Sequence, residues 1–187
     1  MMIPKFKSAR AGRQLDRRRF VGGIAAFSLT ALAAAEDTPP DRRLLAFVHT
    51  HTGETLSTVY FQNGNYLAPS LEHVNHFLRD FRTNEVHSID PGLLDILFDL
   101  QAQTHRPGPF EVISGYRSPQ TNAALRRQSG AVAEHSLHME GRAIDVRLRG
   151  FPTTKLRDLA ISLHRGGVGF YAVSDFLHVD TGRVRIW

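Results

Sequence analysis

Apolar side chains recur every three or four residues in two stretches of the first half of the chain. The first stripe, within residues 70–81, consists of Leu71, Val74, Phe77, Leu78 and Phe81. The second, within residues 91–104, consists of Leu93, Leu94, Leu97 and Leu100. This spacing places each set on one face of a helix, and Ser70 stands where the first helix would be capped. We therefore predict two helices whose apolar faces pack into a core.

Shorter apolar runs bounded by turn residues predict strands. These runs cover residues 44–50, 55–62, 110–114, 143–148, 168–173, 176–180 and 183–187. Two further helices are expected: one runs over residues 118–128, with Ser118 as N-cap and Pro119 in its first turn, and the other covers 153–164. Helices come early and most strands come late, which favours an α+β domain with a central antiparallel sheet and helices packed on it.

Residues 1–35 have the pattern of an export signal. Residues 16–21 (Asp-Arg-Arg-Arg-Phe-Val) resemble the twin-arginine motif, and an apolar run of 16 residues follows. That run is shorter than the roughly 20 residues needed to cross a bilayer, and Ala33 and Ala35 fit an A-x-A cleavage site. We predict a signal peptide over 1–35, a spacer over 36–43 and one domain over 44–187, exported to the periplasm or cell envelope. A retained membrane-anchoring helix is the alternative.

The formal charge of +5 does not indicate nucleic-acid binding. Residues 1–35 hold seven of the 23 Lys and Arg and one of the 18 acidic residues. Residues 36–187 therefore carry 16 basic and 17 acidic side chains, a net charge of −1. A basic groove for phosphates is not expected in such a domain.

The chain has ten histidines and no cysteine, so any metal must be held by histidine and carboxylates. His138 precedes the predicted strand that contains Asp145, and His178 lies on another predicted strand. Antiparallel pairing of these strands would bring the three side chains together. They would fill three positions of a tetrahedral Zn²⁺ and leave the fourth for water, whose proton a nearby carboxylate would accept. From spacing alone, other histidine trios stay open.

Three ordered motifs carry a resemblance to a known family. They are Ser-Gly-Tyr-Arg-Ser at 114–118, S-x-H-x6-D at 136–145 and D-x-x-H at 175–178. Together they resemble the zinc site of D-Ala-D-Ala peptidases (the LAS superfamily, with hedgehog-like folds) and, more closely, the YcbK-like murein endopeptidases. The resemblance covers most of residues 44–187. It implies a hedgehog-like fold and the zinc ligands His138, Asp145 and His178.

The resemblance also implies roles for Asp175 and Arg117, and the alternation of side chains along a strand suggests one for Asp180. Asp175, three residues before the last ligand, takes the position of the general base, where D-Ala-D-Ala peptidases have the longer Glu. Asp180 would share a face with His178 on a regular strand, as the base instead or as a hydrogen-bonding partner. Arg117 matches the family's G-Y-R segment and would bind a substrate carboxylate or the developing oxyanion.

The resulting hypothesis is zinc-dependent hydrolysis of peptide cross-links between peptidoglycan stem peptides by a monomeric DD- or LD-endopeptidase, at bonds between diaminopimelate residues. D,D-carboxypeptidase activity is an alternative. A second alternative is a wall-binding module that holds zinc but does not catalyse a reaction, and the shorter acid at position 175 favours it. A non-haem iron(II) enzyme uses the same ligand types, but such sites usually separate the first His and the carboxylate by one residue, and here six intervene.

Overall fold

The structure is a computed structural model that describes residues 41–106, 108–129 and 132–187, so the predicted signal peptide lies outside the described residues. The strands in these ranges are β1 (Arg42–His49), β2 (Thr55–Gln62), β3 (Asn65–Tyr66), β4 (Phe110–Ser114), β5 (Ala143–Leu148), β6 (Gly167–Tyr171), β7 (Phe176–Asp180) and β8 (Arg185–Ile186). The helices are α1 (Ala68–Phe77), α2 (Pro91–Thr104), α3 (Pro119–Gln128), α4 (Thr153–Leu163) and a short 3-10 helix, η1 (Leu137–Glu140). No helix in these ranges is long and apolar enough to cross a membrane. The predicted α+β class is confirmed.

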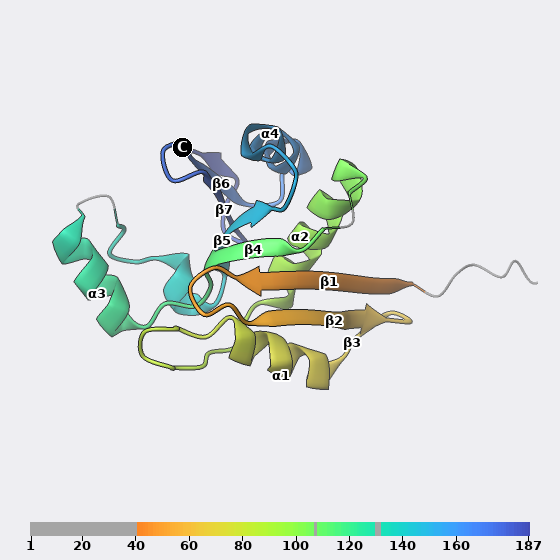
Figure 1. Cartoon of the computed structure of the whole chain (residues 1–187), viewed down its shortest axis with the longest axis horizontal. Helices are drawn as coiled ribbons and strands as arrows, with labels where there is room; N and C mark the ends of the chain where they lie inside the picture. Colours follow the sequence, from red (N-terminus) through yellow and green to blue (C-terminus); the bar gives the residue numbers. More distant parts are fainter. Residues whose placement is uncertain (1–40, 107, 130–131) are drawn as a thin grey trace, which may run out of the picture. The chain divides into compact units, whose positions relative to one another are not determined.

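The strands of the described residues form one sheet, in the order β3-β2-β1-β4-β5-β7-β6-β8 (Figure 1). The prediction of an antiparallel sheet is wrong in two places, because β1 pairs with β4 and β6 pairs with β8 in parallel. Between the β1–β2 hairpin and β4 the chain passes through α1 and α2, and a crossover of this length lets β4 enter parallel to β1. After β7 the chain reverses, and β8 reaches the free edge of β6. The sheet is therefore mixed.

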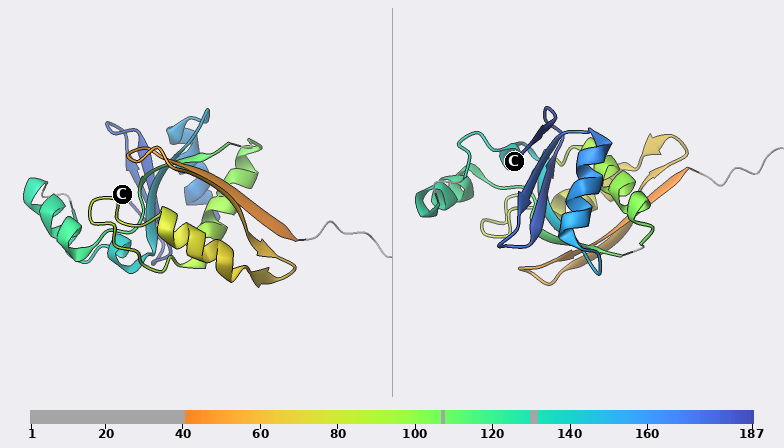
Figure 2. Two further views of the ribbon diagram at one scale, coloured as in Figure 1. Left: turned by 60° about the horizontal axis from the view of Figure 1, so that its bottom comes forward. Right: turned by 90° about the horizontal axis from the view of Figure 1, so that it is seen from above.

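One face of the sheet carries the hydrophobic core. Ile144 and Val146 on β5 and Leu177 on β7 are buried in one cluster with apolar residues of α1, α2 and α4. Figure 2 shows α2 and α4 side by side against the sheet, where they also contact each other. Successive side chains of a strand point to opposite faces, so Asp145 and His178 point to the face away from this core. The core thus fixes the strands that carry the candidate site.

The first helix differs most from its predicted range of 70–81. Leu67 is its N-cap and Pro69 lies in its first turn, so Ser70 is inside the helix and caps nothing. Pro suits this position because its fixed φ is helical and its missing N–H would be unpaired in any case. The helix ends at Phe77, and the carbonyl of Leu78 accepts a hydrogen bond from Tyr116 N at 2.8 Å. A tertiary contact therefore replaces the last predicted turn.

The other predicted elements differ from the structure only at their ends. Residues 91–104, 110–114, 143–148 and 176–180 are confirmed in full. β1 begins at Arg42, inside the predicted spacer. α4 ends one residue early because His164 adopts a left-handed φ of 51°. The strand predicted over 168–173 spans Gly167–Tyr171, and the last strand is reduced to Arg185–Ile186.

Candidate metal centre

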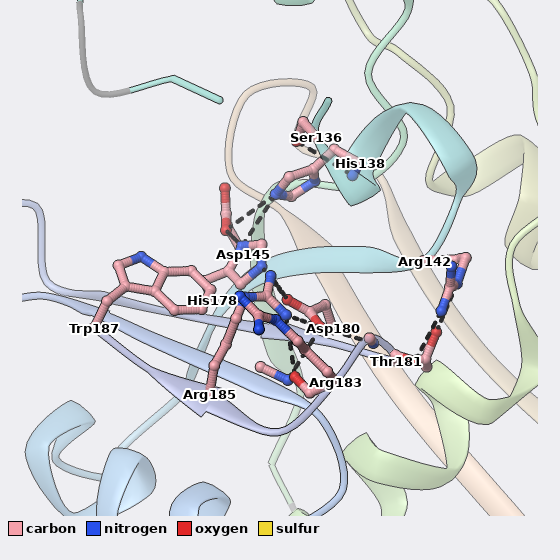
Figure 3. A network of polar contacts seen from close by, with 12 residues as sticks. Ser136, His138, Arg142, Asp145, His178, Asp180, Thr181, Arg183, Arg185 and Trp187 are labelled. Carbon is pink, nitrogen blue, oxygen red and sulfur yellow. Dashed lines mark hydrogen bonds and ion pairs between the residues drawn. The ribbon is translucent and has the colours of Figure 1, made fainter. Parts of the chain in front are cut away.

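Three side chains from η1, β5 and β7 converge at one point (Figure 3). β5 and β7 pair so that Asp145 lies directly opposite His178, and Nδ1 of His178 lies 2.8 Å from Oδ1 of Asp145. Nε2 of His138 lies 3.2 Å from that nitrogen and 3.3 Å from that oxygen. All three residues are buried. In the described part of the chain they are the one group of three or more such side chains close enough to hold a metal ion.

The three atoms match the size of a zinc site. Zn²⁺ binds imidazole nitrogen and carboxylate oxygen at about 2.0–2.2 Å, so two ligands of one tetrahedron lie about 3.3–3.6 Å apart. One of the three separations, 3.3 Å, lies within this range, a second, 3.2 Å, lies 0.1 Å below it, and the third, 2.8 Å, is shorter. Two imidazoles and one carboxylate also leave one coordination position open. The donor set therefore fits a catalytic type of zinc site.

Hydrogen bonds outside the centre fix which ring nitrogen of each histidine points inward. Nδ1 of His138 lies 2.7 Å from the carbonyl oxygen of Gly115, so Nδ1–H donates there and Nε2 faces the centre. Nε2 of His178 lies 3.1 Å from Oδ2 of Asp180, so Nδ1 faces the centre. Partners of this kind set the tautomer and orientation of metal-binding histidines. Both rings are therefore arranged as ligands by the protein itself.

The carbonyl of Gly115 is held in place by a close backbone contact. A Cβ at this position would lie 2.6 Å from the carbonyl oxygen of Leu78. The next residue, Tyr116, donates its N–H to that same oxygen at 2.8 Å. Ser118 then caps α3, as predicted, by accepting a hydrogen bond from Thr121 N. The Ser-Gly-Tyr-Arg-Ser motif thus aims the Gly115 carbonyl at His138 and leads into α3.

Asp180 is fully buried, and both of its carboxylate oxygens accept hydrogen bonds. Oδ1 accepts from Gly167 N at 3.0 Å and from Gly182 N at 2.8 Å. The guanidinium of Arg185 spans both oxygens, at 3.1 and 2.7 Å. Burial opposes ionisation, but hydrogen bonds from His178, Gly182 and Arg185 outweigh it and hold the pKa of Asp180 below its usual range. The carboxylate of Asp180 is therefore charged, and it orients His178 by accepting a hydrogen bond from Nε2. Asp180 does not line the pocket.

Asp175 lies apart from the centre. It occupies the turn before β7 with a left-handed φ of 50°. Its carboxylate lies 3.9 Å from Nη1 of Arg147, and its side chain is 63% exposed. It is not among the residues that line the pocket over the ligands. The structure therefore brings Asp180 to the ligands, as a partner of His178, and does not bring Asp175 there.

Arg117 borders the centre. Its Nη2 lies 3.7 Å from Oδ2 of Asp145 and 3.5 Å from Oγ of Ser114. A β-bulge in β4 pairs Ser114 with Asp145 and so turns both toward one face. Nε of Arg117 is buried and has no hydrogen-bond partner among the described residues, and burial lowers the pKa of its guanidinium. A buried guanidinium with an unpaired donor beside a pocket is suited to bind an anionic group.

A pocket of about 480 Å³ opens over the ligands. It is lined by Arg117, Ser129, Val132, Ala133, His135, Ser136, Leu137, His138, Asp145, Tyr171, Phe176, His178, Arg185 and Trp187. His135 lines the pocket but is exposed and does not join the cluster. Arg185 and Trp187 also line the pocket, although the sequence motifs did not predict them as site residues. The signal that would have found them is the single tryptophan of the chain, two residues after an arginine and close to the last ligand motif.

The site is a buried His–Asp–His centre beside an arginine, and it opens into a pocket on the face of the sheet that lies away from the core. This arrangement is that of a metallopeptidase site. Comparison with known proteins gives the particular family. Residues 37–187 match the family model described as peptidoglycan L,D-endopeptidase MepK, and the chain belongs to this peptidase family. The resemblance to murein endopeptidases is thereby confirmed.

Individual relatives agree with the family match. The chain is 41% identical over 176 residues to the peptidoglycan L,D-endopeptidase MepK of Escherichia coli strain K12, covering 92% of this chain and 97% of that protein. It is 42% identical over 166 residues to the probable peptidoglycan L,D-endopeptidase MepK of Haemophilus influenzae, covering 88% of each. Comparison with solved structures gives no significant match.

Proposed function

We propose that this protein is a zinc-dependent L,D-endopeptidase that hydrolyses peptide cross-links in bacterial peptidoglycan. The observation that carries the proposal is the buried cluster of His138, Asp145 and His178 beneath a pocket, in a chain that belongs to a peptidase family. The names of the relatives support an L,D bond over a D,D bond. The family resemblance supports a bond between diamino acid residues of neighbouring stem peptides. The α+β fold, with the site on one face of its sheet, supports a hedgehog-like fold for the domain.

Each residue has a task in this reaction. His138, Asp145 and His178 would hold a zinc ion, which would supply Lewis-acid polarisation of the scissile carbonyl and activation of a water molecule. Arg117 donates hydrogen bonds to the negative charge that develops on the carbonyl oxygen, or to a substrate carboxylate. Its unpaired Nε and its position on the pocket support this role. Asp180 keeps His178 in the tautomer that leaves Nδ1 free.

We assign Asp180 a positioning role and give Asp175 no part in the chemistry. Both oxygens of Asp180 are occupied by His178, Arg185 and backbone N–H groups, so neither is available to accept a proton from water. The carboxylate of Asp175 faces Arg147 on an exposed turn. A general base must lie within hydrogen-bond reach of the proton it accepts, and this geometry does not support that role for either residue.

We also propose that the protein acts as a monomer in the periplasm or cell envelope after export by the twin-arginine pathway. The twin-arginine pattern at residues 16–21 supports this route, together with the apolar run and the Ala-x-Ala site that follow it. A peptidoglycan substrate lies outside the cytoplasm, so export and the proposed activity agree.

The proposal is tested by digesting purified muropeptides, one set joined by L,D bonds and another by D,D bonds. Zinc-loaded protein is expected to open the L,D cross-links and to leave the D,D cross-links intact, and a chelator is expected to stop the reaction. Mass spectrometry of the products identifies the bond that is cut. If the zinc-loaded protein binds both sets without cutting either, it is a wall-binding module and the endopeptidase proposal fails.

A further inference from the structure

Three aromatic side chains beside the metal centre take no part in the chemistry proposed above. Tyr171 on β6, Phe176 on β7 and Trp187 all line the pocket. The rings of Tyr171 and Phe176 stack with their centroids 4.5 Å apart, and Nε1 of Trp187 donates to the hydroxyl of Tyr171 at 3.2 Å. We call these three residues the aromatic wall.

The backbone fixes Trp187 in this wall. Its N–H donates to the carbonyl of Val168 at 3.2 Å, and its carbonyl accepts from Phe170 N at 3.1 Å, so the residue pairs with β6 beyond the end of β8. A Cβ on Gly169 would lie 2.6 to 2.8 Å from three atoms of the indole. The indole therefore lies directly on the backbone of β6, in space that any side chain at position 169 would fill.

The aromatic wall stands next to the ligands and keeps apolar surface exposed. The ring centroids of Trp187 and His178 are 5.1 Å apart (Figure 3). Trp187 is 49% exposed and Tyr171 is 37% exposed. Covering such apolar surface with an apolar part of a ligand is favourable, and aromatic side chains with one exposed face are typical binding anchors. The wall is thus placed to bind a group that lies beside the reacting bond.

We propose that the aromatic wall binds the aliphatic chain of the diamino acid residue next to the scissile bond. This inference rests on the proposed function. The rings of Trp187 and His178 lie 5.1 Å apart, and an extended peptide advances about 3.3–3.6 Å per residue. A group bound on the ring of Trp187 therefore belongs to a residue adjacent to the bond that is cut. The methylene chain of the diamino acid is the apolar group at that position. The disaccharide is attached farther along the stem peptide, beyond the reach of this wall.

A binding measurement that needs no turnover tests the inference. Trp187 is the single tryptophan of the chain, so its fluorescence reports on the wall alone. Chelator-treated protein is titrated with a sugar-free, L,D-linked stem-peptide dimer and, separately, with the peptide-free disaccharide. The dimer is expected to give a saturable change in emission and the disaccharide none. No response to the dimer, or an equal response to the disaccharide, overturns the inference.

Variants supply a second test. Trp187→Ala is expected to raise KM for the peptide dimer about tenfold with little change in kcat, whereas Trp187→Phe retains most of the affinity. Gly169→Ala displaces the indole without removing it and is expected to raise KM in the same way. The matched control is Ile186→Ala, the preceding residue on β8, because Ile186 is exposed and lies outside the pocket lining. Zinc content is measured for every variant, and an unchanged KM in zinc-replete Trp187→Ala contradicts the inference.

The two proposals fail in different ways. If wild-type protein opens cross-links but Trp187 neither responds to the dimer nor affects KM, the role of the aromatic wall is refuted and the endopeptidase stands. If the dimer changes the emission of Trp187 but zinc-loaded protein never cuts it, the wall binds peptide and the endopeptidase is refuted.

Discussion

His178 and Asp180 stand two residues apart on β7, and Oδ2 of Asp180 lies 3.1 Å from Nε2 of His178. The guanidinium of Arg185 donates hydrogen bonds to both oxygens of the same carboxylate, at 2.7 Å and 3.1 Å. A chain of contacts therefore runs from Arg185 through Asp180 to Nε2, the outward-facing nitrogen of His178, and leaves Nδ1 facing the metal centre. The carboxylate acts on the chemistry only through the ligand that it orients.

Replacing Asp180 by Asn is expected to weaken zinc binding by about 10- to 100-fold, which is typical for the loss of a carboxylate behind a histidine ligand. The amide carries no charge, and its NH₂ group faces the donors of Arg185 or Gly167. Competition with a chromogenic chelator measures the zinc dissociation constant. Arg183→Ala, an exposed position between β7 and β8, serves as the control and should bind zinc like the wild type. Equal affinities for Asp180→Asn and wild type would refute the supporting role.

Asp175→Asn is expected to leave kcat/KM within about twofold of the wild type. The carboxylate faces Arg147 on an exposed turn and lines no part of the pocket. Loss of a true general base costs about 10²- to 10⁴-fold, so the two roles are easy to tell apart by steady-state kinetics on an L,D-linked muropeptide. A hundredfold loss would restore Asp175 as the base that the family resemblance implies.

Arg117→Lys is expected to lower kcat by about 100-fold while zinc content stays constant. Lysine keeps the positive charge but loses the planar fork, and removal of a single donor to a developing oxyanion costs about 10²- to 10³-fold. Single-turnover kinetics separate this loss from slow product release. An Arg117→Lys enzyme with wild-type kcat would show that Arg117 only balances the charge of Asp145, which lies 3.7 Å away.

The ligand trio was within reach of sequence reasoning because its ordered motifs resemble those of a known family, whereas spacing alone left other histidine trios open. Asp145 and His178 lie on strands whose ranges were predicted correctly, and one antiparallel pairing places them opposite each other. The hydrogen bond between Asp180 and His178 was also within reach, since the two residues share a face of one strand, but the contact that orients His138 was not. The Gly115 carbonyl meets His138 across 23 residues of chain, and it is held there by packing against Leu78. Such pairings follow from tertiary packing, which no local pattern encodes.

The same limit explains why the sheet was predicted as antiparallel and why Arg185 and Trp187 were missed. The sequence contains no local signal that β8 pairs with β6 rather than with its neighbour in the chain, β7. That pairing places Trp187 over Gly169 and turns Arg185 toward Asp180. The positions of the strands along the chain could be predicted, but their order in the sheet could not, and that order determines which side chains reach the site.

Asp80 links the stability of the domain to the segment that carries Arg117. It is buried, and its carboxylate accepts hydrogen bonds from Ser118 N at 2.9 Å, Ser118 Oγ at 2.7 Å and Arg82 N at 2.9 Å. Burial opposes its ionisation, but hydrogen bonds from Ser118, Thr121 and the backbone outweigh that effect and lower the pKa of Asp80 to about 2. In an unfolded chain the pKa of Asp is about 3.9.

A carboxyl group whose pKa is lower in the folded state stabilises the fold fully above its unfolded pKa. The contribution of Asp80, about 2 kcal/mol, is therefore expected to be present above about pH 4 and to disappear as the pH falls toward 2. Asp80→Asn lacks this contribution, so it should be less stable than the wild type near neutral pH, and the difference should shrink between about pH 4 and 2. Urea unfolding at a series of pH values measures both proteins, with chelator present so that loss of metal does not add to the change. A stability difference that stays constant from pH 5 to pH 2 would mean that Asp80 acts through packing and not through its charge.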